Sequence, residues 1–145
     1  MGAALQRQDF REPLARLEII ADAFLSVGTP VQHAAARLLA SRGPVEGAIR
    51  ARAVANLAHA REAVAGTPVS VLDVEGGWYA TLRLPRTQSE EDWTQTLLEE
   101  DDVHVHPGHF FDFEGEAFLV VSLLTPEDVF REGLRRIVSR VVADA

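Results

Sequence analysis

The spacing of apolar residues changes near the middle of the chain. In the first part, apolar residues recur every three or four positions, which is the spacing of amphipathic helices. The predicted helices cover residues 10–27, 30–42 and 44–65. Thr29 can cap the second helix, and Pro30 suits its first turn. Pro44 starts the third helix, and Gly66 closes it.

Beyond Gly66 the spacing falls to two residues, which predicts strands. The predicted strands cover residues 67–75, 77–84, 103–106 and 117–124. The first two form a hairpin that turns at residues 75–77. The last strand is apolar enough to be buried on both faces.

Two more helices accompany these strands. Ser89 and Asp92 resemble a capping box that opens a helix over residues 90–100. Thr125 is expected to cap the last helix, with Pro126 at its first position. The apolar residues expected on the buried face of this helix are Val129, Phe130, Leu134, Ile137, Val138 and Val141.

This order of elements predicts an α+β fold. Antiparallel neighbouring strands with helices on one face form a two-layer sandwich, preceded by two or three helices. Residues 1–43 contain no strand and are expected to form a separate helical segment that packs on something outside the sandwich. Residues 44–145 are expected to form the α+β domain itself.

Composition excludes several classes of function. The chain has no cysteine, so disulfides, thiolate nucleophiles and cysteine-ligated metals are absent. A net charge of −8 argues against a nucleic-acid surface. No apolar run reaches the length of a membrane span and no signal peptide is evident, so a cytoplasmic location is expected. All 14 basic residues are arginine, so no side chain can form a Schiff base.

The histidines of "HVHPGHFFDFEGE" raise the question of a metal site. His104 and His106 would point to the same face of a strand, and His109 with Asp112 or Glu114 could complete a site for a metal-dependent hydrolase. The alternative is that Pro107 and Gly108 turn the chain and His109 faces a groove. We favour this alternative and expect no metal.

Other motifs are ambiguous or weak. The serines have no GxSxG elbow, which argues against a nucleophile. Gly76 and Gly77 fit a hairpin turn better than close approach to a ligand. The segment "SVGTPVQHAA" is either a helix–helix turn or a place where Ser26, Thr29 and Gln32 meet an anion or a partner chain.

Taken in order, these segments resemble the C-terminal part of a class I/II, fold-type-I aminotransferase that uses pyridoxal phosphate. The segment "LEIIADAFLSVGTPVQHAAARLL" resembles the end of the large domain, and "IRARAVANLAHA" resembles the helix that links it to the small domain. "EGGWYATLRLP" resembles a hairpin of the family. "WTQTLLEEDDVHVHPGHFF" and "AFLVVSLLTPEDVFREGLRRI" resemble the remainder of the small domain.

The resemblance implies positions for functional residues. The residues that it places at the substrate pocket are Gly77, Trp78, Tyr79, His106, His109 and Val120. Ser26, Thr29 and Gln32 would contact a neighbouring subunit, and the N-terminal helices would make a dimer and meet the large domain. The implied activity is transfer of an amino group between an amino acid and a 2-oxo acid.

Two departures from the family qualify that activity. The cofactor lysine is absent, so the chain alone is expected to bind no pyridoxal phosphate, to have no catalytic residue of its own and to be inactive. Many family members carry an arginine for the substrate carboxylate where this chain has Val120. The alternative interpretation is a stand-alone binding or interaction module derived from this domain.

Overall fold

A computed structural model describes residues 10–24, 27–115 and 117–144. Contacts divide the chain into two compact units, residues 1–43 and residues 44–145. Four α-helices and a four-stranded antiparallel sheet make up the described part of the chain, which confirms the predicted α+β class. No helix among the described residues is long and apolar enough to cross a membrane.

The first unit holds helix α2 (Arg11–Ala23) and the beginning of α3 (Thr29–Ala63). Helix α2 ends before Val27, where the sequence pattern placed its end, and no residue of α2 is buried. Its apolar stripe is exposed within this unit, as are the apolar residues of the following turns. The exposed side chains include Leu14, Leu17, Ile20, Phe24, Val31, Leu38 and Leu39.

The helix break predicted at Pro44 is wrong, because α3 continues through this residue. Proline has no N–H to donate to the carbonyl four residues earlier and disfavours a helix interior by about 3 kcal/mol. Alanine- and arginine-rich turns on both sides, residues 34–42 and 48–63, favour the helix strongly enough to include it. Thr29 is the first residue of α3 and not its cap, with Pro30 in the first turn.

The sheet has the strand order β1-β2-β4-β3, with every neighbouring pair antiparallel. Its strands are β1 (Ser70–Val71), β2 (Tyr79–Arg83), β3 (His106–Pro107) and β4 (Phe118–Ser122). The central pair is β2 and β4, and the outer two strands are shorter than the alternation predicted. The predicted strand at residues 103–106 is displaced, because the pairing with β4 begins only at His106.

One face of the sheet carries the core. Ala80 lies opposite Val121 and Leu82 lies opposite Leu119, so these four residues share a face. They pack with buried residues of α3, α4 (Glu90–Asp101) and α5 (Glu127–Ala143). The helical residues are Ala60 of α3, Trp93 and Leu97 of α4, and Phe130, Leu134, Ile137 and Val141 of α5. Helices therefore cover one face, as expected for a two-layer sandwich.

The last helix differs from its prediction at two positions. Val129 is 56% exposed, whereas the apolar pattern placed it on the buried face. Thr125 does not cap α5: its hydroxyl donates a hydrogen bond to the carbonyl oxygen of Ser122, and Pro126 stands at the N-cap position without a side-chain bond. By contrast, Ser89 caps α4 as predicted, accepting a hydrogen bond from the Asp92 N–H over 3.1 Å.

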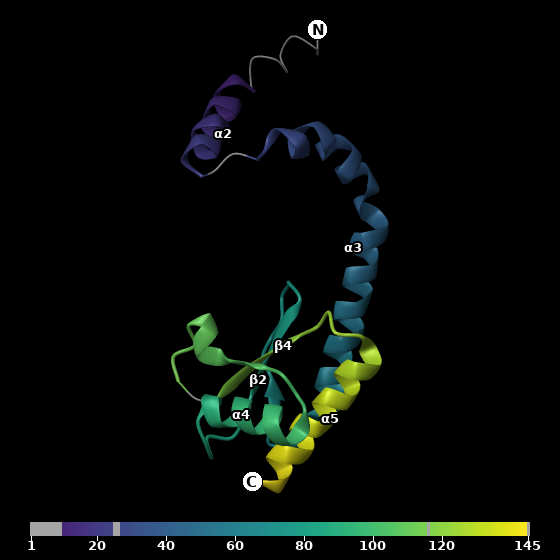
Figure 1. Cartoon of the computed structure of the whole chain (residues 1–145), viewed down its shortest axis with the longest axis vertical. Coiled ribbons are helices and arrows are strands. Elements are labelled where there is room, and N and C mark those ends of the chain that lie inside the picture. The colour runs from purple at the N-terminus through teal and green to yellow at the C-terminus, as the bar shows by residue number, and fades with distance from the viewer. Residues whose placement is uncertain (1–9, 25–26, 116, 145) are drawn as a thin grey trace. The chain divides into compact units, whose positions relative to one another are not determined.

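A buried amide joins α3 to the loop between β4 and α5. The side chain of Asn56 is fully buried, and its Nδ2 atom donates hydrogen bonds to the carbonyl oxygens of Leu123 (2.9 Å) and Thr125 (2.8 Å). Figure 1 shows α5 beside the C-terminal part of α3, where Arg131 Nε donates to His59 Nε2 over 2.9 Å. These bonds hold the first turns of α5 against α3.

Candidate functional site

An aromatic cluster gathers where β2 begins and β3 ends. The Tyr79 ring lies 6.4 Å from Trp78 and 5.8 Å from Phe111, measured between centroids. The His106 ring lies 6.3 Å from Phe111 and 6.4 Å from Phe110. We call these five residues the aromatic cluster. The four residues with phenyl, phenol or indole rings are 42% to 68% exposed, so the cluster leaves apolar surface uncovered.

Strand register explains why distant residues meet in this cluster. Side chains alternate between faces, so Tyr79 lies on the face opposite the core residue Ala80. His106 pairs with Val120, which pairs in turn with Thr81, so these side chains share the face of Tyr79. Gly77 adopts a left-handed conformation (φ +79°) just before Trp78, which a residue with a side chain adopts less readily.

The loop after β3 supplies the remaining rings. Residues Gly108–Phe111 form a short 3-10 helix, η1, which places Phe110 and Phe111 over the outer face of the sheet. Phe113 stacks on Phe118 of β4 at 4.9 Å. Val120, which lies on the same face of the sheet as Phe118, is only 2% exposed. The position that the resemblance assigned to carboxylate recognition is therefore a buried, uncharged side chain.

A groove of about 680 Å³ lies between residues 102–106, the end of β4 and the first half of α5. His104, His106 and Val120 line it, together with Asp128 and Glu132 of α5. Gly77, Trp78, Tyr79 and His109 are not among its lining residues. The structure thus brings His106 and Val120 into one groove and joins Trp78 and Tyr79 to His106 through Phe111.

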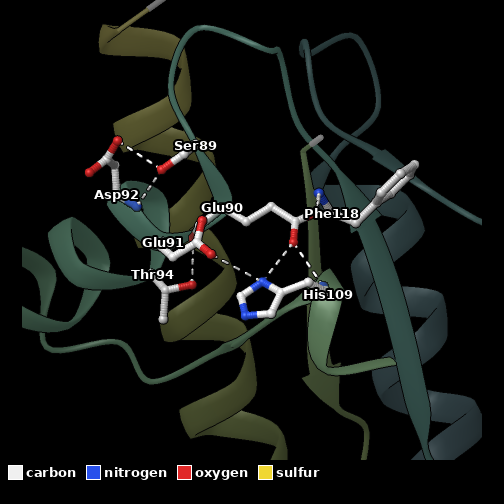
Figure 2. A network of polar contacts seen from close by, with 7 residues as sticks. All are labelled: Ser89, Glu90, Glu91, Asp92, Thr94, His109 and Phe118. Atoms are coloured by element: carbon white, nitrogen blue, oxygen red, sulfur yellow. Dashed lines mark hydrogen bonds and ion pairs between the residues drawn. The ribbon is translucent and has the colours of Figure 1, made fainter. Parts of the chain in front are cut away.

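His109 lies against the acidic first turn of α4. Its Nδ1 atom is 3.4 Å from Glu90 Oε2 and 3.4 Å from Glu91 Oε1 (Figure 2). Its backbone N–H also donates to Glu90 Oε2 over 2.9 Å. The ring is thus held at α4, apart from His104 and His106, whose own centroids are 5.2 Å from each other. No three His, Cys, Asp or Glu side chains in the described ranges are arranged to hold a metal ion.

In the turn at the start of α3, the Gln32 side chain is hydrogen-bonded to the backbone of the same turn. Gln32 Nε2 donates to the carbonyl oxygen of Val27 over 2.6 Å, and the Gln32 N–H donates to the carbonyl oxygen of Gly28 over 3.1 Å. Thr29 is exposed at the first position of the helix. Ser26, the third residue predicted to meet a neighbouring subunit, lies outside the described residues.

One carboxylate of the groove, that of Glu132, is paired with arginines of α5. Hydrogen bonds from Arg135 and Arg136 to the Glu132 carboxylate lower its pKa to about 2. The Arg135 guanidinium makes a two-point contact at 2.7 and 2.8 Å, and Arg136 Nε lies 2.8 Å away. The same contact raises the pKa of Arg135. Glu132 therefore stays ionised, and its charge is met by its own helix.

We expect this pairing to be visible in an acid titration. Because the folded-state pKa of Glu132 lies below its ordinary value, the pairing stabilises the domain above that ordinary value and is lost as pH falls toward about 2. Carboxyl-carbon NMR should show Glu132 titrating near pH 2 and moving upward in R135Q. R131Q, which removes a guanidinium that contacts His59 instead, should leave it unmoved. An unchanged Glu132 titration in R135Q would contradict the pairing.

Comparison with known proteins identifies the family. The sequence model for aminotransferase class I and II matches residues 1–137. No curated protein sequence is a significant match. Among solved structures, the α-aminoadipate aminotransferase LysN from Thermus thermophilus, complexed with N-(5'-phosphopyridoxyl)-L-leucine, is 25% identical with a TM-score of 0.66. The alignment covers 92% of this chain and 36% of that one.

Two more distant structures share the fold. The aromatic aminotransferase from Pyrococcus horikoshii is 20% identical with a TM-score of 0.66, and the alignment covers 76% of this chain and 30% of that one. The aspartate aminotransferase from Rhizobium meliloti is 18% identical with a TM-score of 0.63, and the alignment covers 89% of this chain and 35% of that one. The chain thus spans about a third of each solved relative. Because the family model matches nearly all of its residues, this chain belongs to the class I and II aminotransferase family.

Proposed function

We propose that this chain is the C-terminal part of a pyridoxal-phosphate-dependent aminotransferase and supplies one wall of its substrate pocket. The enzyme would transfer an amino group between an amino acid and a 2-oxo acid. The observation that carries the proposal is the aromatic cluster, where Phe111 links Tyr79 to His106 at ring distances near 6 Å. Tyr79 and His106 are positions at which the family resemblance expects substrate contacts, and the phenyl, phenol and indole rings of the cluster are exposed.

The chain does not fit the cofactor by itself. It has no lysine, so none of its side chains can anchor pyridoxal phosphate through a Schiff base. Its groove also carries the carboxylates of Asp102, Asp128 and Glu132, which would repel a phosphate. Arg136 of the same groove is engaged by Glu132 and by the Asp101 carbonyl. We therefore assign the cofactor to a large domain and derive no chemical step from this chain.

The presence of a valine at position 120 has a consequence for substrate recognition. A buried valine cannot form the two-point ion pair with which an arginine holds a carboxylate. If the chain forms a pocket wall, carboxylate recognition belongs to other residues of the assembled enzyme. The apolar and aromatic character around Val120 then favours an uncharged part of the substrate at this position.

The N-terminal helices are the proposed subunit and domain contact. Several large apolar side chains of α2 and early α3 are exposed within the first unit. Burying such side chains is worth about 1.5–3 kcal/mol each, which favours a covered state. We propose that residues 10–42 pack on the large domain and on a second copy, with Thr29 and Gln32 near the neighbouring subunit.

An assay of the chain with and without a large domain tests the proposed function. Alone, after incubation with pyridoxal phosphate and dialysis, the chain should retain no aldimine absorbance, because it has no lysine. Joined to or co-expressed with a lysine-bearing large domain encoded beside it, it should bind the cofactor and transaminate. W78A should then raise KM, since it removes half-exposed aromatic surface from the pocket wall.

Two results would count against this proposal. A dialysis-resistant adduct on the isolated chain would show that it holds the cofactor itself. An assembled protein without aminotransferase activity would favour the alternative, a binding module derived from the aminotransferase domain.

A further inference from the structure

Glu90 holds both ends of the loop that carries two residues of the aromatic cluster, Phe110 and Phe111. It is the first residue of α4, and although it is a carboxylate it is only 3% exposed. Its Oε2 atom accepts the N–H of His109 over 2.9 Å, and its Oε1 atom accepts the N–H of Phe118 over 2.7 Å (Figure 2). One side chain thus binds the backbone at both ends of residues 109–118.

Two backbone hydrogen bonds in the first part of this loop are longer. The Asp112 N–H reaches the His109 carbonyl at 3.3 Å, and the Phe113 N–H reaches the Gly108 carbonyl at 3.5 Å. The two bonds to Glu90 are shorter and involve an ionisable acceptor, which makes them the stronger attachment. Phe110 and Phe111 lie inside this closed loop, so their position over the sheet depends on where its ends are held.

Gly108 leaves the space that the Glu90 carboxylate occupies. A β-carbon at residue 108 would lie 2.8 Å from Glu90 Oε1 and 2.7 Å from the β-carbon of Phe118. The backbone of the loop therefore approaches α4 as closely as a glycine allows. This close approach is what lets a glutamate on the first turn of a helix reach two backbone amides of the loop.

Glu91, the next residue, differs from Glu90 in its exposure and in its hydrogen bonds. Its Oε1 atom is as far from His109 Nδ1 as the Glu90 carboxylate is, 3.4 Å. Its side chain, however, is 65% exposed, against 4% for Glu90. The two glutamates therefore share the contact with the His109 ring, and the two bonds to backbone amides distinguish Glu90 from Glu91.

We infer that Glu90 is a positioning residue of the pocket, which fixes Phe110 and Phe111 against Tyr79 and His106 by holding His109 and Phe118. The inference rests on the proposed function for its link to substrate. Its structural part concerns this chain alone. Glu90 touches neither substrate nor cofactor in this role and acts only through the loop.

Hydrogen exchange on the full 145-residue chain tests the structural part. In E90Q, a single acceptor oxygen remains for two donors, so the amide of His109 or Phe118 should exchange faster by about tenfold or more. In E90A both amides should do so. The ladder amides of Ala80 and Val121 should keep their protection. Ring contacts between Tyr79 and Phe111, measured by NMR, should weaken in the same variants.

E91Q is the matched control, with the same loss of charge one residue away, and should leave both amides protected. Exchange in E90Q and E90A that equals E91Q would overturn the inference. So would uniform loss of protection that includes Ala80 and Val121, because Glu90 would then support the whole fold.

Kinetics of the chain assembled with its large domain test the functional part. E90Q should raise KM about tenfold with a smaller change in kcat, because a displaced pocket wall weakens substrate binding. E91Q should match the wild type. An active wild type with equal KM in E90Q and E91Q would overturn the role in the pocket. An inactive wild type would count against the proposed function, and the exchange data would still decide the role of Glu90.

Discussion

Replacing Gly108 by alanine is expected to destabilise the domain by about 3 kcal/mol. The added β-carbon would lie 2.7 Å from the Phe118 β-carbon, 2.8 Å from Glu90 Oε1 and 3.2 Å from the Phe118 carbonyl oxygen. Phe118 belongs to β4 and is paired with Arg83, so its backbone cannot retreat without disturbing the sheet. Glu90 is buried and cannot swing aside into solvent.

Urea unfolding compares this variant with G47A. Gly47 lies inside α3, and a β-carbon there meets nothing within 4 Å. G47A should therefore be stabilising by about 0.5–1 kcal/mol, the usual gain of alanine over glycine in a helix. Equal stability of G108A and the wild type, at unchanged m-value, would mean that the loop relaxes away from Glu90 at little cost.

The second large effect is expected at Asn56, where substitution by alanine should cost about 2–4 kcal/mol. The change would leave the carbonyl oxygens of Leu123 and Thr125 without their amide donor and would open a cavity at a fully buried position. N56D should be at least as harmful, since a carboxylate cannot donate to either carbonyl.

R52A is the control for Asn56. Arg52 lies one turn earlier on α3 and reaches the carbonyl of Leu124 in the same loop, but its contact is exposed and 3.4 Å long. Its removal should change the free energy of unfolding by less than about 0.5 kcal/mol. Comparable losses in N56A and R52A would show that the loop, and not the buried amide, carries the stabilisation.

Much of the fold was predictable because its elements carry strong local patterns. The alternation around residues 79–83 and the apolar run around residues 118–122 indicate the two central strands, which pair in antiparallel register. The cap at Ser89 was predictable for the same local reason. An error arose where helix-favouring turns on both sides outweighed a single helix-breaking residue. Pro44 would end an isolated helix, yet it lies inside one of 35 residues.

For the candidate site, the sequence proposed residues but did not predict how they are arranged. The resemblance pointed to Trp78, Tyr79, His106 and Val120, and the strand register explains how the last three reach one face. His109 lies against α4 because Glu90 binds its backbone, a contact between residues 19 apart that no local pattern reports.

Neither of two buried polar residues, Glu90 and Asn56, was singled out from the sequence. Glu90 looks like an ordinary acidic residue in the first turn of a helix, where such residues favour the helix dipole. Nothing in its neighbours distinguishes it from Glu91. Asn56 did carry a signal, since it is the only asparagine in the chain and stands among alanines and leucine on the inner side of a helix. A lone amide on such a face indicates a specific hydrogen-bond partner.

The short outer strands affect whether this sheet can pair with the sheet of another molecule. Strands β1 and β3 form its two edges, and each contains only two residues. Growth of a sheet from molecule to molecule needs a long straight edge of unpaired N–H and C=O groups. Here one edge ends in Pro107, which has no N–H to offer, and the chain then turns into η1. Among the described residues, the sheet therefore offers little edge on which a strand of another molecule could pair.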